Sequence, residues 1–567
     1  MRTLSCDLLV IGSGAGGLSA AVTAAHHGLD VVLIEKDTAM GGATAWSGGW
    51  MWTPRHPLHE GPREDIEQPR TYLKNALGRR YDADRVDAFL HAAPHMVGFF
   101  HEKTATRFVD GGGIADIHGD LPGASEGGRQ VGPKPVNGWR LKPSLLRKLT
   151  RQMYETSFLG MGIMAGPDLQ KFLHVMSGPR NFAHAAWRVG LHTVDMAVRR
   201  RGMQLVNGPA LIARLAKSAD DLGVRTYVDA PAKRLLLEGK AVCGAVVATP
   251  RGEVEVRARR GTVLATGGFP NDAERTAALF PKGTGENHKT LSPATTTGDG
   301  IRMAEEAGAV LDTSGASPAA WCPVSLVPFA NGRVGRFPHI IDRGKPGVIG
   351  VLRDGRRFVN EADGYHQYVD AMIRATPEGE EVASWLICDH RYQRRMPFGM
   401  SRPFPLPRFP YLRNGYLRHG RTLEELSVAC GIDPTQLRRT VDEFNAGAIR
   451  GIDPEFGRGR TAYNRKSGDF AHGPNPSLGP IENAPFYAIK VYPGSFGTFA
   501  GLRADAHARV LDAAGDPIEG LYAVGTDQAN VLGGHYPSGG INIGPAMTFG
   551  YVAARHAAGV TGYEVEV

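Results

Sequence analysis

Apolar runs separated by a glycine-rich turn open the chain. Residues 6–11 are apolar apart from Asp7, which is typical of a strand buried in a parallel sheet. Small residues fill positions 18–27, and Gly28 is a natural helix stop before a second apolar run at 30–34. The pattern predicts a strand, a helix and a strand, which together make one βαβ unit with a right-handed crossover.

Later parts of the chain carry patterns typical of both helices and strands. The segment 65–220 is typical of helices joined by polar loops, whereas 324–495 is richer in Pro, Arg and aromatic residues and carries a helical stretch at 421–449 broken at Asp433-Pro434. Strands are predicted at 224–229, 232–238, 241–248 and 261–268. The pattern is small and apolar again at 520–525, and a helix is predicted from Gly544.

Composition places the chain among globular proteins of more than one domain. It has 567 residues, of which 42% are hydrophobic and 22% charged. The apolar stretch near the N-terminus is interrupted by glycines, and we read it as strand, turn and helix and not as a signal peptide. Five cysteines without metal or redox spacing indicate a reducing cytoplasm and no metal site.

The net charge of +8 excludes little by itself. Arginines are scattered, with a local cluster at 199–201, and no nucleic-acid-binding signature accompanies them. We interpret the charge as a solvated basic face, with a weak hold on a membrane surface as the alternative. Residues 140–201 fit either a surface helical subdomain or a lid or membrane-touching patch through which a poorly soluble substrate enters.

The first turn carries the strongest motif in the sequence. Gly12-Ser13-Gly14-Ala15-Gly16-Gly17 follows a predicted strand and opens a predicted helix, and Glu35 lies at the end of the next strand. This is the dinucleotide-binding arrangement, in which glycines allow the tight turn, the approach of a pyrophosphate to the helix N-terminus and close packing of helix on strand. Glu35 is placed to accept hydrogen bonds from a ribose.

The loop after Glu35 favours FAD over NAD. The sequence KDTAMGGATAWSGG resembles the FAD-binding loop of the fumarate reductase flavoprotein superfamily, and LATGGF at 264–269, TTGDGIRMAEEAGA at 296–309 and GLYAVG at 520–525 agree with it. The resemblance implies non-covalent FAD. Its expected contacts are Gly12, Gly14, Ala15, Gly16, Gly17, Glu35, Lys36, Gly42, Ala43, Thr44, Ser47, Gly48, Gly49, Ala232, Ala265, Thr266, Gly267, Asp299, Gly525, Asn542 and Ile543.

These segments predict an α/β fold, α+β overall, in two domains. A discontinuous Rossmann-type FAD-binding domain takes residues 1–323 and 496–567, and an inserted α+β catalytic domain takes 324–495. The sequence contains no second dinucleotide motif and no haem-attachment motif. We therefore expect an external electron acceptor, such as a quinone, an electron-transfer protein or oxygen.

Two positions argue against a dicarboxylate substrate. Fumarate reductases place an Arg four residues after the Glu of an R-F-V-N-E motif, where this chain has Tyr365 after Glu361. They place a second Arg near the C-terminus, where this chain has Pro537. Loss of both cations suits an apolar ketone better, although a fumarate reductase-like ene-reductase and a non-catalytic flavoprotein remain the competing hypotheses.

The same two regions resemble the 3-ketosteroid Δ1-dehydrogenases. The similar segments are RFVNEADGYHQYVDAM (357–372), NAPFYAIKVYPGSFGTFAGL (483–502) and LYAVGTDQANVLGGHYPSGGINIGPAMTFGYVAARHA (521–557). The resemblance implies that Tyr365 takes a proton from the carbon alpha to the ketone. Tyr536 and the N–H of Gly540 would hold the ketone oxygen, while the beta carbon gives a hydride to flavin N5.

One family feature is missing. The further Tyr that supports the base in these enzymes has no counterpart in the matching segment 116–123, where His118 can relay a proton instead. Ser538, two residues after Tyr536, gives a Tyr-x-Ser pair that also resembles the Δ4-(5α)-dehydrogenases. A steroid and a smaller cyclic ketone such as cyclohexanone therefore both fit, and Δ1 and Δ4 regiochemistry both stay open.

Overall fold

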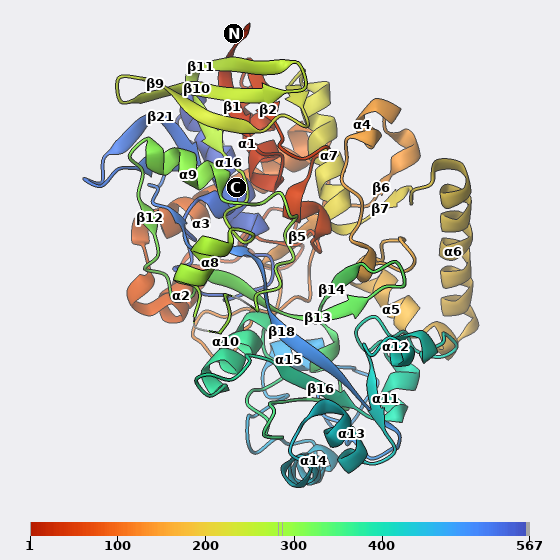
Figure 1. The fold of residues 1–567 in the computed structure, drawn as a ribbon. Coiled ribbons are helices and arrows are strands. Elements are labelled where there is room, and N and C mark those ends of the chain that lie inside the picture. The colour runs from red at the N-terminus through yellow and green to blue at the C-terminus, as the bar shows by residue number, and fades with distance from the viewer. Residues whose placement is uncertain (1, 282, 286, 563–567) are drawn as a thin grey trace.

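The computed structural model describes residues 2–281, 283–285 and 287–562, and its two largest sheets define two halves of the molecule. Figure 1 shows the sheet that contains both the N-terminal strand and the C-terminal strand β21 (Pro517–Ala523) at one end, and the sheet built around β18 (Phe486–Thr498) toward the other. The mixed parallel and antiparallel pairing confirms the predicted α/β, α+β overall, fold class.

The first sheet has eight strands in the order β20-β21-β11-β1-β2-β8, with β10 on β11 and β9 on β10. Its parallel centre pairs Leu8 with Val31 and Thr262 with Leu521. The strands are β1 (Arg2–Ile11), β2 (Val31–Ile34), β8 (Arg225–Tyr227), β9 (Ala232–Glu238), β10 (Ala241–Thr249), β11 (Gly252–Leu264), β20 (Arg509–Leu511) and β21. Apolar side chains from the central strands are buried, as their continuous apolar runs predict.

Two small-residue helices pack closely beside this sheet. In α1 (Ala15–His26), Ser19 Oγ donates to Met547 O of α16 (Ile543–Ala558) at 2.6 Å. A Cβ on Gly550 would lie 2.4 Å from Gly16 O, so glycine is what lets the two backbones approach. Contact between these helices brings the first and last parts of the chain together. The other helices of this half are α2 (Glu67–Leu77), α3 (Ala83–Lys103), α7 (Asn207–Asp221), α8 (Ala273–Leu279) and α9 (Asp299–Glu306).

The second large sheet is antiparallel and runs β14-β13-β18-β16-β15, with β17 on β18. Its strands are β13 (Ala319–Pro328), β14 (Val334–Pro338), β15 (Val348–Val351), β16 (Ser384–Cys388), β17 (Arg418–Gly420) and β18. The helices α10 (Tyr365–Ala375), α11 (His390–Arg395), α12 (Phe409–Arg413), α13 (Leu423–Cys430), α14 (Pro434–Ile449) and α15 (Ala462–Ser467) surround it. The proposed domain boundaries at 323/324 and 495/496 fall within β13 and β18, which pair with each other.

Shorter elements join the halves. A small sheet of β3 (Met51–Trp52), β4 (Phe108–Asp110) and β5 (Gln130–Pro133) lies in the order β3-β5-β4.

Residues 139–205, which we call the outer subdomain, carry α4 (Pro143–Arg147), α5 (Pro167–Leu173) and α6 (Pro179–Arg199) and lie along one side of the molecule in Figure 1. Across the described parts of the chain, no helix is both long and apolar enough to cross a bilayer.

The pattern analysis predicted element types well and boundaries less well. The break at Asp433-Pro434 is confirmed, because Asp433 caps α14 by accepting a hydrogen bond from Gln436 N at 2.7 Å. The strand predicted at 261–268 is wrong at both ends. It begins at Gly252, because residues 252–257 pair with β10 on one side, and it ends at Leu264, before Gly267 and Gly268 turn with positive φ.

Candidate active site

The glycine-rich turn joins β1 to α1 as the motif predicts. Gly12 has φ +109°, and a Cβ there would lie 2.1 Å from Ala265 O; a Cβ on Gly17 would lie 2.0 Å from Gly12 O. By contrast, the nearest atom to a Cβ on Gly14 would be Thr44 Oγ1 at 3.8 Å. The turn is therefore tightly packed on the protein side and open over Gly14, at the first turn of α1, where a phosphate would bind.

Glu35 lies at the end of β2, beside this turn. Its Oε2 accepts from Ser13 N at 3.0 Å and from Ser13 Oγ at 2.6 Å, while Oε1 accepts from Asp37 N at 2.9 Å. Burial raises the pKa of the Glu35 carboxyl, and these three donors oppose the rise. Next to it, Lys36 forms an ion pair with Asp299 at 2.6 Å, so two predicted cofactor positions meet directly.

The loop after β2 folds back onto the turn. Ala15 N donates to Thr44 Oγ1 at 3.2 Å, within the 3₁₀ helix η1 (Gly42–Trp46). Ser47 Oγ donates to Thr44 O at 2.7 Å and accepts from Gly49 N at 3.0 Å, which fixes the segment 47–49 that includes Gly48. The structure thus brings the predicted loop residues, including Ala43, against the N-terminus of α1.

The rest of the predicted cradle lies at the ends of β11 and β21 and at the start of α16. Thr266 N donates to Asp527 Oδ2 at 2.5 Å, which joins the turn containing Ala265 and Gly267 to the 3₁₀ helix η7 (Gly525–Asp527). Ala232, at the start of β9, follows Ala230, whose N–H donates to Glu35 O at 2.9 Å. All of these positions gather at the carboxyl ends of the parallel strands, where such sheets bind ligands.

The first turn of α16 presents a buried polar atom that has no partner in the part of the chain that the structure describes. Asn542 precedes Ile543, and its Oδ1 is buried without a hydrogen-bond partner among the described residues. A cavity of about 20 Å³ lies there, lined in part by Gly525, Asn542 and Ala546. A buried amide oxygen without a partner, the open space over Gly14 and the positive end of the α16 dipole fit the polar ring and the pyrophosphate of FAD.

Tyr365 and Tyr536 meet although they are 171 residues apart. Their hydroxyl oxygens are 2.6 Å apart, with Tyr365 donating to Tyr536, and their rings cross edge-to-face with centroids 5.0 Å apart. Tyr365 is the first residue of α10, and Phe496 of β18 packs on its ring at 5.4 Å. Burial raises the pKa of both phenols, so each hydroxyl is protonated in this closed arrangement.

The turn after Tyr536 is held from two sides. Pro537 O accepts from Tyr72 Oη at 2.6 Å and from Ile117 N at 2.9 Å. Gly540 has φ +92°, and a Cβ there would lie 2.8 Å from Trp50 O, so only glycine fits. Within the described residues the Gly540 N–H has no acceptor, which leaves it free to donate to a carbonyl oxygen.

His118 lies near this pair but is not bonded to Tyr365. Its Nε2 is 3.4 Å from Gln367 Nε2, and the same amide nitrogen donates to Tyr536 O at 3.1 Å. Burial lowers the pKa of His118, which favours the neutral ring. His118 thus reaches the tyrosines through Gln367, a residue that sequence reasoning did not identify.

Ser538 belongs to a buried polar cluster behind the tyrosines. Its Oγ accepts from Gln130 Nε2 at 2.8 Å. In the same cluster Asp116 accepts from Trp52 Nε1 at 3.0 Å and pairs with Arg129 at 2.6 Å. These contacts join the predicted segment 116–123 to the turn at 536–540, so Ser538 supports the geometry of that turn.

Two further residues beside the tyrosines escaped the sequence analysis. His366 stacks on Tyr536 with ring centroids 5.5 Å apart, its Nδ1 accepts from Trp321 N at 3.1 Å, and burial lowers its pKa to about 3. Tyr463 of α15 is near enough to raise the pKa of both Tyr365 and Tyr536. A Cβ on Gly119 would lie 3.5 Å from Thr461, which places α15 against the segment where the family's further Tyr is missing.

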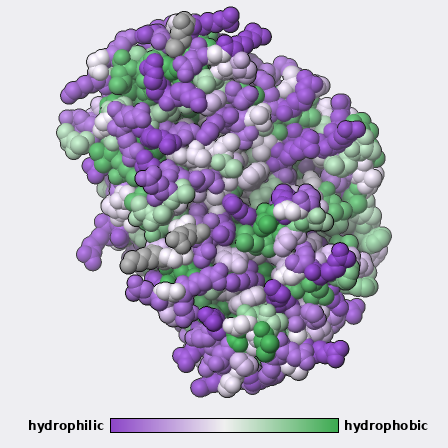
Figure 2. Space-filling model, in the orientation of Figure 1, coloured by the Kyte–Doolittle hydropathy of each residue, from purple (hydrophilic) through white to green (hydrophobic). Residues whose placement is uncertain are grey.

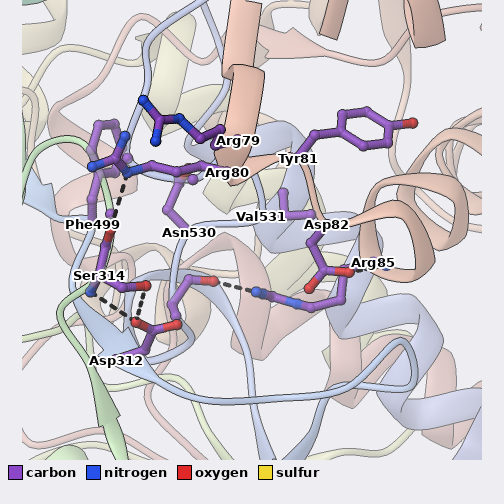
Figure 3. A pocket seen from close by; sticks show the side chains of 14 residues that line it. Arg79, Arg80, Tyr81, Asp82, Arg85, Asp312, Ser314, Phe499, Asn530 and Val531 are labelled. Atoms are coloured by element: carbon purple, nitrogen blue, oxygen red, sulfur yellow. Dashed lines mark hydrogen bonds between the residues drawn. The ribbon is translucent and has the colours of Figure 1, made fainter. Parts of the chain in front are cut away.

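A separate cavity of about 660 Å³ opens near the turn at 536–540 (Figure 3). Arg80 Nε donates to Ser314 O at 3.0 Å, and Arg85 donates to Ala529 O at 2.6 Å. Phe499, which lines the cavity, also packs on Tyr536 with centroids 6.0 Å apart. The charged lining does not suit an apolar ketone, and the tyrosine pair does not line this cavity.

Comparison with known proteins gives one consistent result. The sequence matches the FAD binding domain family over residues 7–543. It is 39% identical over 561 residues to the 4-oxocyclohex-2-ene-1-carboxylate 5-dehydrogenase of Sinomonas cyclohexanicum, covering 98% of this chain and 94% of that protein. It is 35% identical to the 3-oxosteroid 1-dehydrogenase of Mycobacterium tuberculosis, covering 99% and 100%. The crystal structure of the 3-ketosteroid delta1-dehydrogenase of Sterolibacterium denitrificans superposes with a TM-score of 0.91 at 32% identity, covering 98% and 100%.

Proposed function

Because the chain belongs to the FAD binding domain family, we propose that it is an FAD-dependent dehydrogenase that forms a carbon–carbon double bond next to a ring ketone. The single observation that carries this proposal is the Tyr365–Tyr536 hydroxyl pair beside the free N–H of Gly540. Relatives that cover nearly the whole chain are named as dehydrogenases of a 3-oxosteroid and of a 4-oxocyclohexene carboxylate, which supports it.

The predicted cradle residues would hold FAD without a covalent bond. The turn at Gly12–Gly17 and the N-terminus of α1 would receive the pyrophosphate, Glu35 the ribose, and the first turn of α16 the isoalloxazine. When bound there, FAD supplies the two-electron acceptor for the oxidation of a C–C bond.

Tyr365 is the proposed proton acceptor, and its environment sets a condition on the reaction. Burial raises the pKa of this phenol, so it does not lose its own proton to become a phenolate without help. The Tyr536 hydroxyl accepts from Tyr365 and keeps its own proton to donate. Together with Gly540 N–H it would hold the ketone oxygen and so make the alpha proton more acidic. Tyr365 would pass its own proton on to solvent and take the alpha proton in its place, so that the phenol is neutral before and after the step.

The proposed substrates are ring ketones of two sizes, a 3-ketosteroid or a smaller cyclohexanone-type ketone. The surroundings of Tyr365 include Phe496 and other buried apolar side chains, which suits either ring system. The proposed electron acceptor is external. All five cysteines are free thiols in the structure, which supports a reducing cytoplasm as the place of action.

An anaerobic mixing experiment tests the proposal. Purified holoenzyme is mixed with androst-4-ene-3,17-dione, cyclohexanone or fumarate, and the flavin absorbance is followed. We expect a ketone to bleach the flavin and an unsaturated ketone product to form. Reoxidation of the reduced enzyme by fumarate, with no response to either ketone, would establish the ene-reductase instead, and silence with all three would remove the proposed activity.

A further inference from the structure

The outer subdomain holds the entire excess positive charge of the protein. Residues 139–205 contain eleven Lys and Arg but only three Asp and Glu, an excess of eight that equals the net charge of the whole chain. The remaining residues are therefore balanced, because 54 basic side chains face 54 acidic ones. Such a local excess is an electrostatic feature of one surface and not of the fold.

Each of the three acidic side chains of the subdomain has a partner within the protein. Asp168 pairs with Arg188 at 2.7 Å and with His184 at 2.7 Å, and Asp195 accepts from Trp139 Nε1 at 2.9 Å. Glu155 forms an ion pair with Arg333 at 2.7 Å. Of the outermost basic residues, Arg180, Arg199 and Arg200 are exposed and form no ion pair with a described carboxylate. The charge presented to solvent is therefore almost purely positive.

Helix α6 has its polar and apolar faces reversed relative to an ordinary surface helix. The positions that face the protein are Ala185, Arg188, His192 and Asp195, of which three are polar. The outward positions are apolar: Phe182, Trp187, Val194 and Val198 are 60%, 66%, 56% and 61% exposed. Small residues lie between them, at Ala183, Ala186, Gly190 and Ala197. A water-facing helix would place its charges on this side.

The apolar surface extends beyond the helix. Leu159 and Met176, in the adjoining loops, are 64% and 63% exposed. On the second half of the molecule, Phe404 and Phe409 are also exposed, and Arg402 donates to Ser157 O at 2.8 Å, which ties that region to the outer subdomain. Figure 2 shows hydrophobic side chains gathered along the side where Figure 1 places α6. Contiguous exposed apolar area of this kind marks an interaction site.

We propose that the outward face of α6, with its arginine flanks, docks the enzyme on an anionic lipid surface. An exposed Trp and Phe between basic residues is the composition of a helix that lies in the plane of a membrane interface. A second copy of the chain is a poorer occupant, because it would bring the same net positive surface against itself. The proposal is independent of the reaction, since the lipid contact does not involve the tyrosine pair.

Vesicle sedimentation of the holoenzyme tests the proposal. We expect it to sediment with vesicles made of equal parts phosphatidylcholine and phosphatidylglycerol. Binding to pure phosphatidylcholine should be at least about tenfold weaker, and about 1 M salt, with a screening length near 3 Å, should abolish most of it. Failure to sediment with the anionic vesicles would overturn the proposal.

Paired variants separate the apolar and the electrostatic contributions. F182S/W187S should weaken binding at least about tenfold, and R199E/R200E at least about 25-fold. The matched controls are V428S/F470S, which removes exposed apolar side chains elsewhere, and K240E/R251E, which reverses exposed charges in other turns. Both controls should bind like the parent. Equal losses in test and control variants would contradict the proposal.

Two further measurements test whether the variant is still folded and active, and whether the outward face of α6 binds a second copy of the chain. Ketone-driven flavin bleaching in F182S/W187S should match the parent, which shows that the fold and the catalytic machinery are intact. Sedimentation velocity without lipid should give the same size for parent and variant. If the parent is a dimer that the F182S/W187S change dissociates, and the parent does not bind vesicles, the proposal is wrong. The outward face of α6 would then bind a second copy of the chain.

Discussion

The FAD cradle and the tyrosine site are built on opposite plans. The cradle is made of main-chain turns at neighbouring strand ends, and its key positions are glycines whose missing Cβ atoms allow contacts such as Gly17 against Gly12 O. The tyrosine site is made of side chains, since Tyr365 and Gln367 of α10, Tyr536 and the support Tyr72 come from three distant segments. The cofactor that many reactions share would be held largely by backbone turns, whereas the particular reaction depends on side chains that tertiary packing brings together.

Replacing Tyr365 should separate the two sites most clearly. Y365F removes the proposed proton acceptor but keeps the ring that packs on Phe496 and Tyr536. We expect kcat with a ring ketone to fall by about 10³-fold or more, with FAD content unchanged. Steady-state kinetics and flavin absorbance measure the two quantities, and Y227F, at an exposed tyrosine, is the control. Undiminished turnover in Y365F would remove this residue from its role.

The converse change breaks the cradle and leaves the tyrosines alone. In G17A the new methyl group would meet Gly12 O at 2.0 Å, so the turn must open. We expect FAD affinity to fall by roughly 100-fold, since misplacing the phosphate-binding turn costs on the order of 3 kcal/mol. Titration of the apoprotein with FAD measures it. G113A, where an added Cβ meets nothing within 4 Å, should bind FAD normally; equal affinity in both variants would count against the assigned turn.

A smaller effect should show which side chain takes the place of the missing tyrosine. Tyr463 is close enough to both phenols to raise their pKa, whereas His118 reaches them only through Gln367. We therefore expect Y463F to lower kcat about tenfold and to shift its pH profile, while H118A changes kcat by less than about threefold. The reverse order of effects would restore His118 as the proton relay.

The last prediction concerns the pH dependence of the free energy of unfolding. It arises in the tyrosine region, from the buried neutral ring of His366. The pKa of His366 is about 3 when folded and 6.5 as a free side chain, so the unfolded chain binds more protons between these values. The contribution of His366 to the free energy of unfolding is therefore fully present above about pH 6.5. It falls as the pH drops below that value, by about 2 kcal/mol at pH 5.

Urea midpoints at pH 7 and pH 5 measure that loss. H366N keeps a side-chain acceptor for Trp321 N but does not titrate, so its pH dependence should be smaller by about this amount. H419N, at an exposed position, should retain the full dependence of the parent. A parent-like slope in H366N would place the pH sensitivity elsewhere.

The contrast between the two sites explains what the sequence could and could not predict. The Gly12–Gly17 turn and Glu35 follow from a local motif and from strand ends, which apolar periodicity places to within a few residues. The rest of the cradle was predicted only through family resemblance. Tyr365 and Tyr536 were identified only through family resemblance, because no local pattern marks two residues 171 positions apart. Their supports Tyr72, Gln367 and His366 carried no signal, since each matters through a contact that only the folded chain makes. The reversed faces of α6 were also invisible, because periodicity alone does not say which face is buried.

The large sequence separation between β1 and the pair β21 and α16 has a consequence for the order of folding. Residues 517–558 supply both a central strand beside β11 and the helix that completes the cradle, while β1 is made first. During synthesis the early strands must wait for residues 517–558 to leave the ribosome before this sheet can close. We therefore expect the flavin to be acquired only after residues 517–558 have been made, so a chain truncated before them would be colourless and without activity.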